Sequence, residues 1–215
     1  MENGDRLTRD EFERRYLAMP NVTKAELVEG VVHLPSPVRL RRHGQPHAFL
    51  VTWVGTYLAS TPGTMAGDNS TARLDLDNEP QPDLLLLIDP AKGGQARISD
   101  DDYVEGAPEL VCEVAASTAS IDLHAKLNAY RRNGVPEYLV WLIEAREVRW
   151  FVLSGSRYEQ LPVGTDGRLR SPTFPGLWLD PAALTAGDLL RVLEVVRMGI
   201  DSKEHADFVL KLSRP

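Results

Sequence analysis

The sequence is poor in the features that mark secreted and membrane proteins. Among its 215 residues there is one cysteine, Cys112, which cannot form an internal disulfide. The longest aliphatic run, residues 84–88, is far shorter than the roughly 20 residues that a membrane-spanning helix requires. The first residues are polar and are not followed by the apolar segment of a signal peptide. We therefore expect a cytoplasmic protein with no membrane partner.

Positive charge is also scarce. Lys and Arg number 24 against 31 Asp and Glu, which gives a net charge of −7. Proteins that coat nucleic acid non-specifically are usually basic, because the neutralised phosphates supply their affinity. A coating role is therefore excluded, whereas an enzyme that contacts nucleic acid through a local basic patch is not.

Several common catalytic motifs are missing. The sequence contains no GxxxxGK[ST], GxGxxG or GxSxG pattern, so no motif supports a P-loop, Rossmann or α/β-hydrolase site. His43 and His47 have the i, i+4 spacing of a zinc-binding pair, but Gly44 and Pro46 lie between them. Because no HExxH motif or nearby third ligand accompanies the two histidines, we do not expect a structural zinc site.

The composition and the hydrophobic pattern predict a mixed α/β protein. With 43 % hydrophobic and 26 % charged residues, the chain has the balance of a globular domain. The pattern predicts helices over residues 8–19, 47–58, 121–133, 187–198 and 203–212, strands over 25–34, 71–77, 83–88, 109–115, 137–143, 148–153 and 157–161, and loops over 35–46 and 89–108. We expect residues 1–185 to form one domain and residues 186–215 to form a C-terminal helical extension packed on it.

Two carboxylates lie where the pattern predicts burial. Asp83 begins the most apolar predicted strand, and Glu113 lies inside another, on the same face as Val111 and Ala115. Burying an ionised carboxylate is costly, so each residue requires a cation, a metal ion or a raised pKa. Two carboxylates on neighbouring buried strands are typical of a Mg²⁺ site. Equally well, Asp83 would cap its strand and Glu113 would pair with an arginine.

Three further positions have more than one interpretation. Lys126 lies at the edge of the apolar stripe of its predicted helix, which would let its ammonium reach the sheet, but an exposed i, i+4 pair with Asp122 explains the spacing better. Glu26 and Glu29 point to opposite faces of the first predicted strand, and one of them would face the site. Cys112 faces the other side of its strand from the carboxylate that follows it, so we interpret it as a core residue.

Four segments in a fixed order resemble a known nuclease family. They are ELVEG (26–30), QPDLLLLI (81–88), PELVCEVAAST (108–118) and KLNAYRRNGVPEYLVW (126–141). Together they resemble the Uma-type restriction endonucleases, a family with a domain of unknown function in the PD-(D/E)xK nuclease superfamily. The likeness runs from about residue 8 to about residue 185 and is specific in its combination of segments. It implies a restriction-endonuclease-like fold, with a central mixed sheet flanked by helices.

The resemblance also implies roles for single residues. Asp83 matches the aspartate of the "PD" motif, and Glu113 matches the acidic residue of "(D/E)xK". The chain departs from the motif two positions later, where Ala115 replaces the lysine. The resemblance places this lysine on the following helix, at Lys126, and aligns Glu26 with the acidic residue of the first strand.

These roles imply a metal-dependent endonuclease that hydrolyses phosphodiester bonds in nucleic acid, with DNA as the expected substrate. Asp83, Glu113 and Glu26, with the backbone carbonyl of Val114, would hold one or two Mg²⁺ (or Mn²⁺) ions against the scissile phosphate. Lys126 would orient the attacking water or stabilise the transition-state charge.

The basic residues Arg39, Arg41 and Arg42 precede the second predicted helix. They are candidates for contacts with backbone phosphates. A solvated loop explains them equally well.

Two other functions fit the same sequence. A catalytically degenerate nuclease fold would act as a nucleic-acid-binding module, and both the net charge and the missing ExK lysine favour it. An assembly protein would self-associate, for example as a homodimer, through the apolar face of residues 187–212, although any packed helix shows such a face. Salt-dependent DNA binding without cleavage would indicate the first, and a monomer at micromolar concentration would count against the second.

Overall fold

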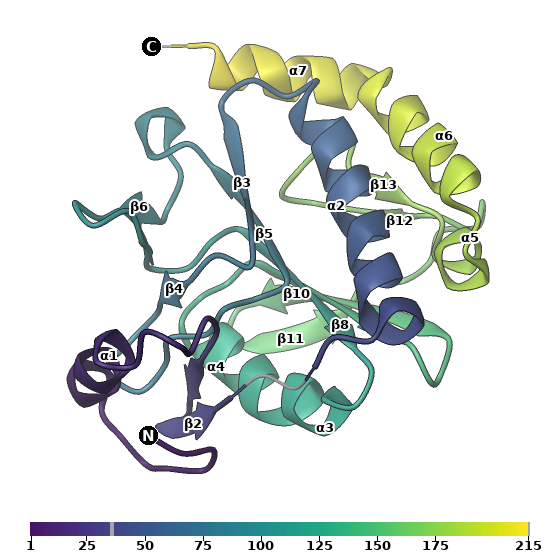
Figure 1. The fold of residues 1–215 in the computed structure, drawn as a ribbon. Helices are drawn as coiled ribbons and strands as arrows, with labels where there is room; N and C mark the ends of the chain where they lie inside the picture. The colour runs from purple at the N-terminus through teal and green to yellow at the C-terminus, as the bar shows by residue number, and fades with distance from the viewer. Residues whose placement is uncertain (35–36, 215) are drawn as a thin grey trace.

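The computed structural model describes residues 1–34 and 37–214, which fold around a six-stranded mixed sheet in the order β11-β10-β9-β8-β5-β3 (Figure 1). Its strands are β3 (Thr64–Asp68), β5 (Leu84–Ile88), β8 (Leu110–Ala115), β9 (Glu137–Leu142), β10 (Glu147–Ser154) and β11 (Arg157–Gln160). Strands β8 and β9 are parallel, and the other neighbouring pairs are antiparallel. The predicted mixed sheet flanked by helices is therefore confirmed.

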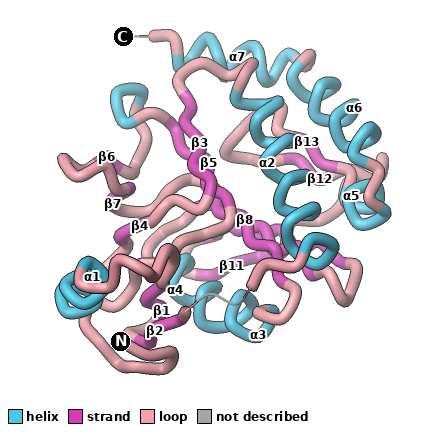
Figure 2. Tube along the Cα trace, in the orientation of Figure 1, coloured by secondary structure: helices cyan, strands magenta, loops and turns pink. Residues whose placement is uncertain are grey.

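Helices cover both faces of the sheet. One face packs against α2 (Gln45–Leu58), α5 (Pro181–Ala186), α6 (Leu189–Ile200) and α7 (Lys203–Leu212). The other face packs against one continuous helix made of α3 (Ala119–Ile121), the π-helical turn η3 (Asp122–Lys126) and α4 (Leu127–Arg132). In Figure 2 the strands lie between α2 and this second helix.

Strand β8 shows how the two faces are assigned. Cys112 and Val114 join the core on the α2 side, whereas Val111 and Ala115 join the core beneath α4. Because successive side chains on a strand alternate, Glu113 points toward the helix that carries Lys126. The residues of α6 and α7 that face the sheet, such as Val192 and Phe208, belong to the same core as α2.

Smaller elements surround this centre. The N-terminal part consists of α1 (Arg9–Leu17) and the hairpin of β1 (Glu26–Val28) and β2 (Val31–His33). A three-stranded sheet joins β4 (Ala72–Arg73), β7 (Val104–Glu105) and β6 (Arg97–Ile98), and β12 (Leu169–Arg170) pairs with β13 (Trp178–Leu179). The turns η1 (Leu40–Gly44) and η2 (Pro90–Lys92) complete the elements of the described residues.

The structure differs from the sequence-based prediction in its short elements. The predicted strand over residues 25–34 is a hairpin, because Glu29 and Gly30 adopt positive φ values of 53° and 70° that reverse the chain. The predicted strand over 71–77 is shortened to β4, and the predicted loop over 89–108 contains η2, β6 and β7.

The basic segment also differs from prediction. Within the predicted loop 35–46, residues Leu40–Gly44 form the π-helical turn η1, which runs directly into α2. Pro35 and Ser36 of that loop, and Pro215 of the C-terminal extension, lie outside the described residues. Within the ranges that the structure describes, no helix combines the length and the apolar character needed to cross a membrane.

Candidate functional site

Asp83, the residue before β5, lies opposite Glu113 of the neighbouring strand β8. The antiparallel register pairs Leu84 with Cys112, so the next pair brings Asp83 opposite Glu113 on the same face of the sheet. Both side chains are buried, at 3 % and 4 % exposure. The backbone N–H of Val114 donates a hydrogen bond of 2.8 Å to Asp83 Oδ2, which fixes the Asp83 carboxylate against β8.

Lys126 reaches this carboxylate pair from the helix below the sheet. Its Nζ donates hydrogen bonds of 2.9 Å to Glu113 Oε1 and 2.8 Å to Glu26 Oε1, and only 5 % of the residue is exposed. Asp122 Oδ1 lies 3.9 Å from the same Nζ. The i, i+4 pair that the spacing suggested thus exists, but it is buried beside Glu113 rather than exposed to solvent.

Lys126 is the last residue of a π-helical turn. The turn η3 spans Asp122–Lys126, where one extra residue per turn changes the phase of the helix. Asp122, Lys126 and Tyr130, which are four residues apart, all face the sheet and are all buried. The hydroxyl of Tyr130 donates a 3.0 Å hydrogen bond to Glu113 Oε1, the same oxygen that Lys126 contacts.

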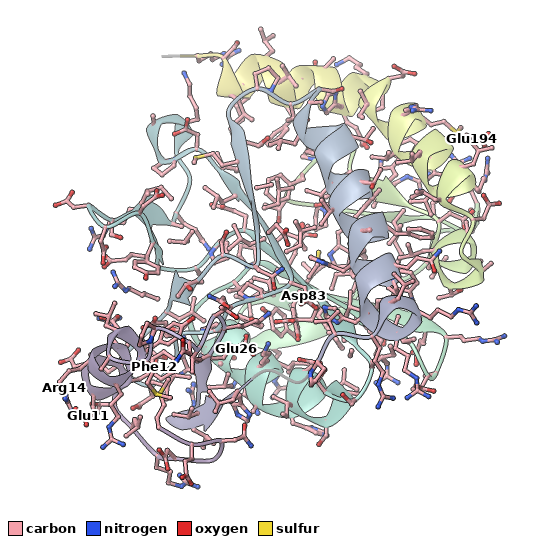
Figure 3. All side chains as sticks on the ribbon, in the orientation of Figure 1. Glu11, Phe12, Arg14, Glu26, Asp83 and Glu194 are labelled. Carbon is pink, nitrogen blue, oxygen red and sulfur yellow. The ribbon has the colours of Figure 1, made fainter. Side chains whose placement is uncertain are left out.

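The N-terminal hairpin brings Glu26 to the site. Leu27 forms an antiparallel bridge with Glu79, four residues before Asp83, and the N–H of Gln81 donates a 2.8 Å hydrogen bond to Glu26 Oε1. This contact ties Glu26 to the segment that leads into Asp83, and both residues are labelled in Figure 3. Glu29, in the turn of the hairpin, points away and forms an ion pair of 2.8 Å with Arg132.

Other basic side chains contact Asp83. His43 Nε2 lies 3.3 Å from Asp83 Oδ1, and Lys24 Nζ lies 3.8 Å from the same oxygen. His47 Nε2 lies 2.8 Å from the backbone oxygen of Asp83 and 2.9 Å from Asp68 Oδ1. Each of the two central carboxylates is thus accompanied by a cationic or imidazole side chain of the protein itself.

The ionisation of these groups follows from burial and from their neighbours. Burial raises the pKa of Glu113, although the adjacent ammonium of Lys126 acts in the opposite direction. For Lys126, burial alone would lower the pKa, but Glu113, Glu26 and Asp122 raise it well above its usual range. The neighbouring carboxyl groups therefore favour the charged form of Lys126 inside the site.

Asp83 and His43 affect each other. Burial alone would raise the pKa of Asp83, but the hydrogen bond with His43 and the N–H of Val114 lower it below its usual value. The contact with Asp83 raises the pKa of His43 against its partial burial. Asp83 is therefore held as a carboxylate.

The carboxyl groups around Lys126 are the side chains that could hold a metal ion. Three buried or half-buried carboxylates, Glu26, Glu113 and Asp122, share the single ammonium of Lys126. Oδ2 of Asp122 is buried and has no hydrogen-bond partner within the described residues. In residues 1–34 and 37–214, no three His, Cys, Asp or Glu side chains are arranged to hold a metal by themselves. Mg²⁺ usually takes one or two carboxylates and keeps several waters, so a metal site at this place would have to be of that kind.

The other predicted residues lie outside this cluster. Arg39, Arg41 and Arg42 are exposed at and within η1, and Arg42 pairs with Glu144 at 3.2 Å. Cys112 is fully buried in the core on the α2 side, away from Glu113.

Sequence reasoning did not assign four residues of the cluster. Tyr130 and Asp122 follow an i, i+4, i+8 pattern with Lys126, which could have revealed them, because polar residues at that spacing share one helix face. His43 was considered only as half of a zinc pair. Lys24 carries no signal in the sequence, since its place beside Asp83 depends on how the hairpin packs.

Comparisons with known proteins give a family and a related fold. The family model Uma2, described as "Putative restriction endonuclease", matches residues 9–182, most of the chain. A crystal structure of a "putative nuclease belonging to DUF820" from Anabaena variabilis ATCC 29413 is similar over 88 % of this chain and 99 % of that chain. Its TM-score is 0.57 and its sequence identity 14 %, so this likeness shows a shared fold. A search of curated proteins finds no match.

Proposed function

The chain belongs to the Uma2 restriction endonuclease family, as its four sequence segments indicated, and from this membership we propose that it is a metal-dependent endonuclease that hydrolyses phosphodiester bonds in DNA. One observation carries the proposal. Asp83, Glu113 and Glu26 come from three separate strands or strand ends and converge, with Lys126 bonded to two of them. A buried cluster of carboxyl groups supports the binding of a divalent cation, whose charge would favour the ionised form of Glu113 against the effect of burial on its pKa.

Asp83 and Glu113 would hold the Mg²⁺ (or Mn²⁺) ion together with waters. Glu26 and the carbonyl of Val114 would become further ligands only after side chains move, because no three carboxylates of the described residues are arranged to hold a metal together. The two hydrogen bonds to Glu113 both go to Oε1, and within the described residues Oε2 accepts none. When bound, the ion would supply Lewis-acid stabilisation of the charge on the phosphoryl oxygens.

Lys126 would act directly on the reacting groups. An ammonium has three N–H donors, and two of those of Lys126 are used by Glu113 and Glu26. The contact to Asp122, at 3.9 Å, is too long for a hydrogen bond, so the third donor remains for the attacking water or a phosphoryl oxygen. Because both partners fix the position of Nζ, the positive charge needs no reorganisation during the reaction.

The remaining residues of the cluster would position these groups. Tyr130 holds Glu113 Oε1, and the N–H of Val114 holds Asp83 Oδ2. Gln81 fixes Glu26 through its backbone N–H. Catalytic geometry of this kind depends on such supporting contacts, because a misplacement of about 1 Å can cost about 100-fold in rate.

The test is cleavage of supercoiled plasmid DNA in Mg²⁺ or Mn²⁺, with EDTA as the metal-free reference. We expect nicking by the wild type and none by Asp83→Asn. Asp166→Asn is the matched control, because Asp166 lies outside the cluster and pairs with Arg170. Calorimetric titration with Mg²⁺ should show binding to the wild type and to the control, and weaker or absent binding to Asp83→Asn.

Each failure has a separate meaning. Cleavage by Asp83→Asn at the wild-type rate would contradict the assignment of the site. Metal binding without cleavage of DNA or RNA would contradict the proposed activity and favour a nuclease fold that only binds nucleic acid. No metal binding by either protein would contradict the metal-dependent mechanism as a whole.

A further inference from the structure

Lys24 and His43 reach the same carboxylate from two different parts of the chain. Lys24 precedes β1, and His43 belongs to the turn η1 before α2. Their terminal nitrogens lie 3.8 Å and 3.3 Å from Asp83 Oδ1, and their side chains are 28 % and 26 % exposed. Asp83 itself is buried, so the solvent-accessible boundary of the site on this side is formed by these two side chains.

The same contact ties a basic segment to the site. His43 shares η1 with Arg41 and Arg42, and Arg39 is the residue before the turn. All three arginines are exposed, and the contact between His43 and Asp83 holds their turn beside the cluster. The π-helical turn continues into α2 without a break, so this segment is part of a helix rather than a free loop.

Existing contacts of these cations leave them able to bind an anion. Lys24 Nζ donates one hydrogen bond, of 2.8 Å, to Asn69 Oδ1, and an ammonium has three donors. Arg42 pairs with Glu144 at 3.2 Å, but both side chains are more than half exposed, and such pairs contribute little to stability. A phosphate could therefore replace Glu144 as the partner of Arg42 at small cost.

We propose that Lys24 and the basic turn of residues 39–43 form one surface that binds consecutive phosphates of a nucleic-acid backbone passing over Asp83. Lys24 contacts the backbone on one side of Asp83, and Arg39, Arg41 and Arg42 contact it on the other. His43 is a positioning residue, which anchors the turn to the site. The surface concentrates positive charge in a chain whose net charge is −7, as a locally basic contact requires. This inference rests on the proposed function, since it names how the substrate of that site is held.

Binding in the absence of metal tests the inference separately from cleavage. Fluorescence anisotropy of a labelled DNA duplex is measured in EDTA with the wild type, with Lys24→Met and with the double variant Arg39→Gln/Arg41→Gln. We expect both variants to bind more weakly. Each lost phosphate contact should reduce the slope of log affinity against log salt by about 1. Lys24→Arg, which keeps the charge, should restore most of the affinity.

Lys92→Met is the matched control, because it removes the same charge beyond Ile88, at the end of β5 opposite to Asp83. It should bind the duplex with the wild-type salt slope. The unfolding temperature of every variant is recorded to show that each one is folded. The same titrations with an RNA duplex and with single-stranded DNA identify which backbone is bound.

Unchanged affinity and slope in both basic variants would overturn the inference, and so would the absence of binding of the wild type to every nucleic acid tested. Salt-dependent binding that is lost in the variants, without any cleavage in Mg²⁺ by the wild type, would support the surface and contradict only the proposed activity. Cleavage in Mg²⁺ by the wild type, with unaltered binding in the variants, would support the proposed activity and contradict the surface.

Discussion

Lys126 Nζ lies 2.9 Å from Glu113 Oε1, and both residues are buried, with less than 6 % of either exposed to solvent. The same ammonium bonds to Glu26, 100 residues earlier in the chain. Lys126 thus joins the helix below the sheet, the central strand β8 and the N-terminal hairpin at one point. We therefore expect the charge of Lys126 to stabilise the fold in addition to its proposed role in catalysis.

Removal of this charge should destabilise the fold. Lys126→Met leaves Glu113, Glu26 and Asp122 without their shared cation, and breaking a buried ion pair of this kind costs about 3 kcal/mol. Urea unfolding at pH 7 measures the loss. Lys203→Met, at an exposed lysine of α7, should change the free energy of unfolding by less than about 0.5 kcal/mol.

A second substitution distinguishes the loss of charge from the loss of packing. In Lys126→Met/Glu113→Gln, one of the uncompensated carboxylates is removed, so part of the lost stability should return. The single variant Glu113→Gln gives the cost of that substitution when Lys126 is present. If Glu113→Gln costs the same in the Lys126→Met background, the two residues do not interact and the ion pair does not stabilise the fold.

Tyr130→Phe tests whether the hydroxyl of Tyr130 positions Glu113. The substitution removes the 3.0 Å hydrogen bond to Glu113 Oε1 and keeps the aromatic ring in its core. The stability loss should be about 1 kcal/mol. If Glu113 is a metal ligand, kcat for DNA cleavage and the affinity for Mg²⁺ should each fall by about 10-fold.

Tyr158→Phe is the control for this prediction. Its hydroxyl also makes one hydrogen bond, of 2.8 Å, but to the backbone oxygen of Val135 at a distance from the cluster. It should lose a similar amount of stability and retain the wild-type kcat and Mg²⁺ affinity. Equal kcat values for the two variants would mean that Tyr130 only packs.

The period of two along the strands was enough to predict one part of the site. It placed Glu113 on the face opposite Cys112, and the structure puts Cys112 in the core beneath α2. The long apolar runs likewise predicted strands that are covered on both faces. These features are local, because they depend only on alternation within a single strand.

The contacts between distant segments were not predictable in this way. The burial of Lys126 depends on its contacts with Glu113 of β8 and Glu26 of the N-terminal hairpin, which the sequence of its own helix does not reveal. The position of Glu26 depends on a hairpin whose turn requires positive φ at Glu29, a residue that gives no turn signal. The residue pattern named both residues with an alternative for each, and the family resemblance selected Lys126 and Glu26 for the site.

Glu79 should make stability depend on pH. It is 3 % exposed and one of its carboxylate oxygens lacks a hydrogen-bond partner within the described residues. Burial, followed by the nearby carboxyl of Glu13, raises its pKa from 4.5 to about 8. Between these values the folded state holds a proton that the unfolded state has released, so the stabilising contribution is complete below pH 4.5 and is lost as the pH rises toward 8.

The variant Glu79→Gln keeps the shape of the protonated acid and cannot ionise. Urea unfolding at pH 5 and pH 8 should show that the variant gains stability relative to the wild type on going to pH 8. Glu159→Gln, at an exposed position of β11, should follow the wild type at both pH values. A constant difference between Glu79→Gln and the wild type across this range would mean that Glu79 is ionised throughout.

Two substitutions of glycine by alanine should change the stability of the protein in opposite directions. Gly30 has a φ of 70° in the turn between β1 and β2, and its neighbour Glu29 already has a φ of 53°. An alanine at position 30 has room for its Cβ, whose nearest neighbour would be the backbone oxygen of Leu7 at 3.4 Å, but it must adopt the left-handed conformation. Gly30→Ala should therefore cost about 1 kcal/mol.

Gly55 lies in the last turn of α2 at an exposed position, and a Cβ there would meet no atom within 4 Å. Gly55→Ala should stabilise the protein by about 0.5–1 kcal/mol, because alanine loses less conformational entropy in a helix. Since the hairpin also carries Glu26, only Gly30→Ala should reduce DNA cleavage in Mg²⁺ when both variants are assayed well below their unfolding temperatures. Full cleavage by a destabilised Gly30→Ala would show that Glu26 does not need the exact hairpin geometry to take part in the reaction.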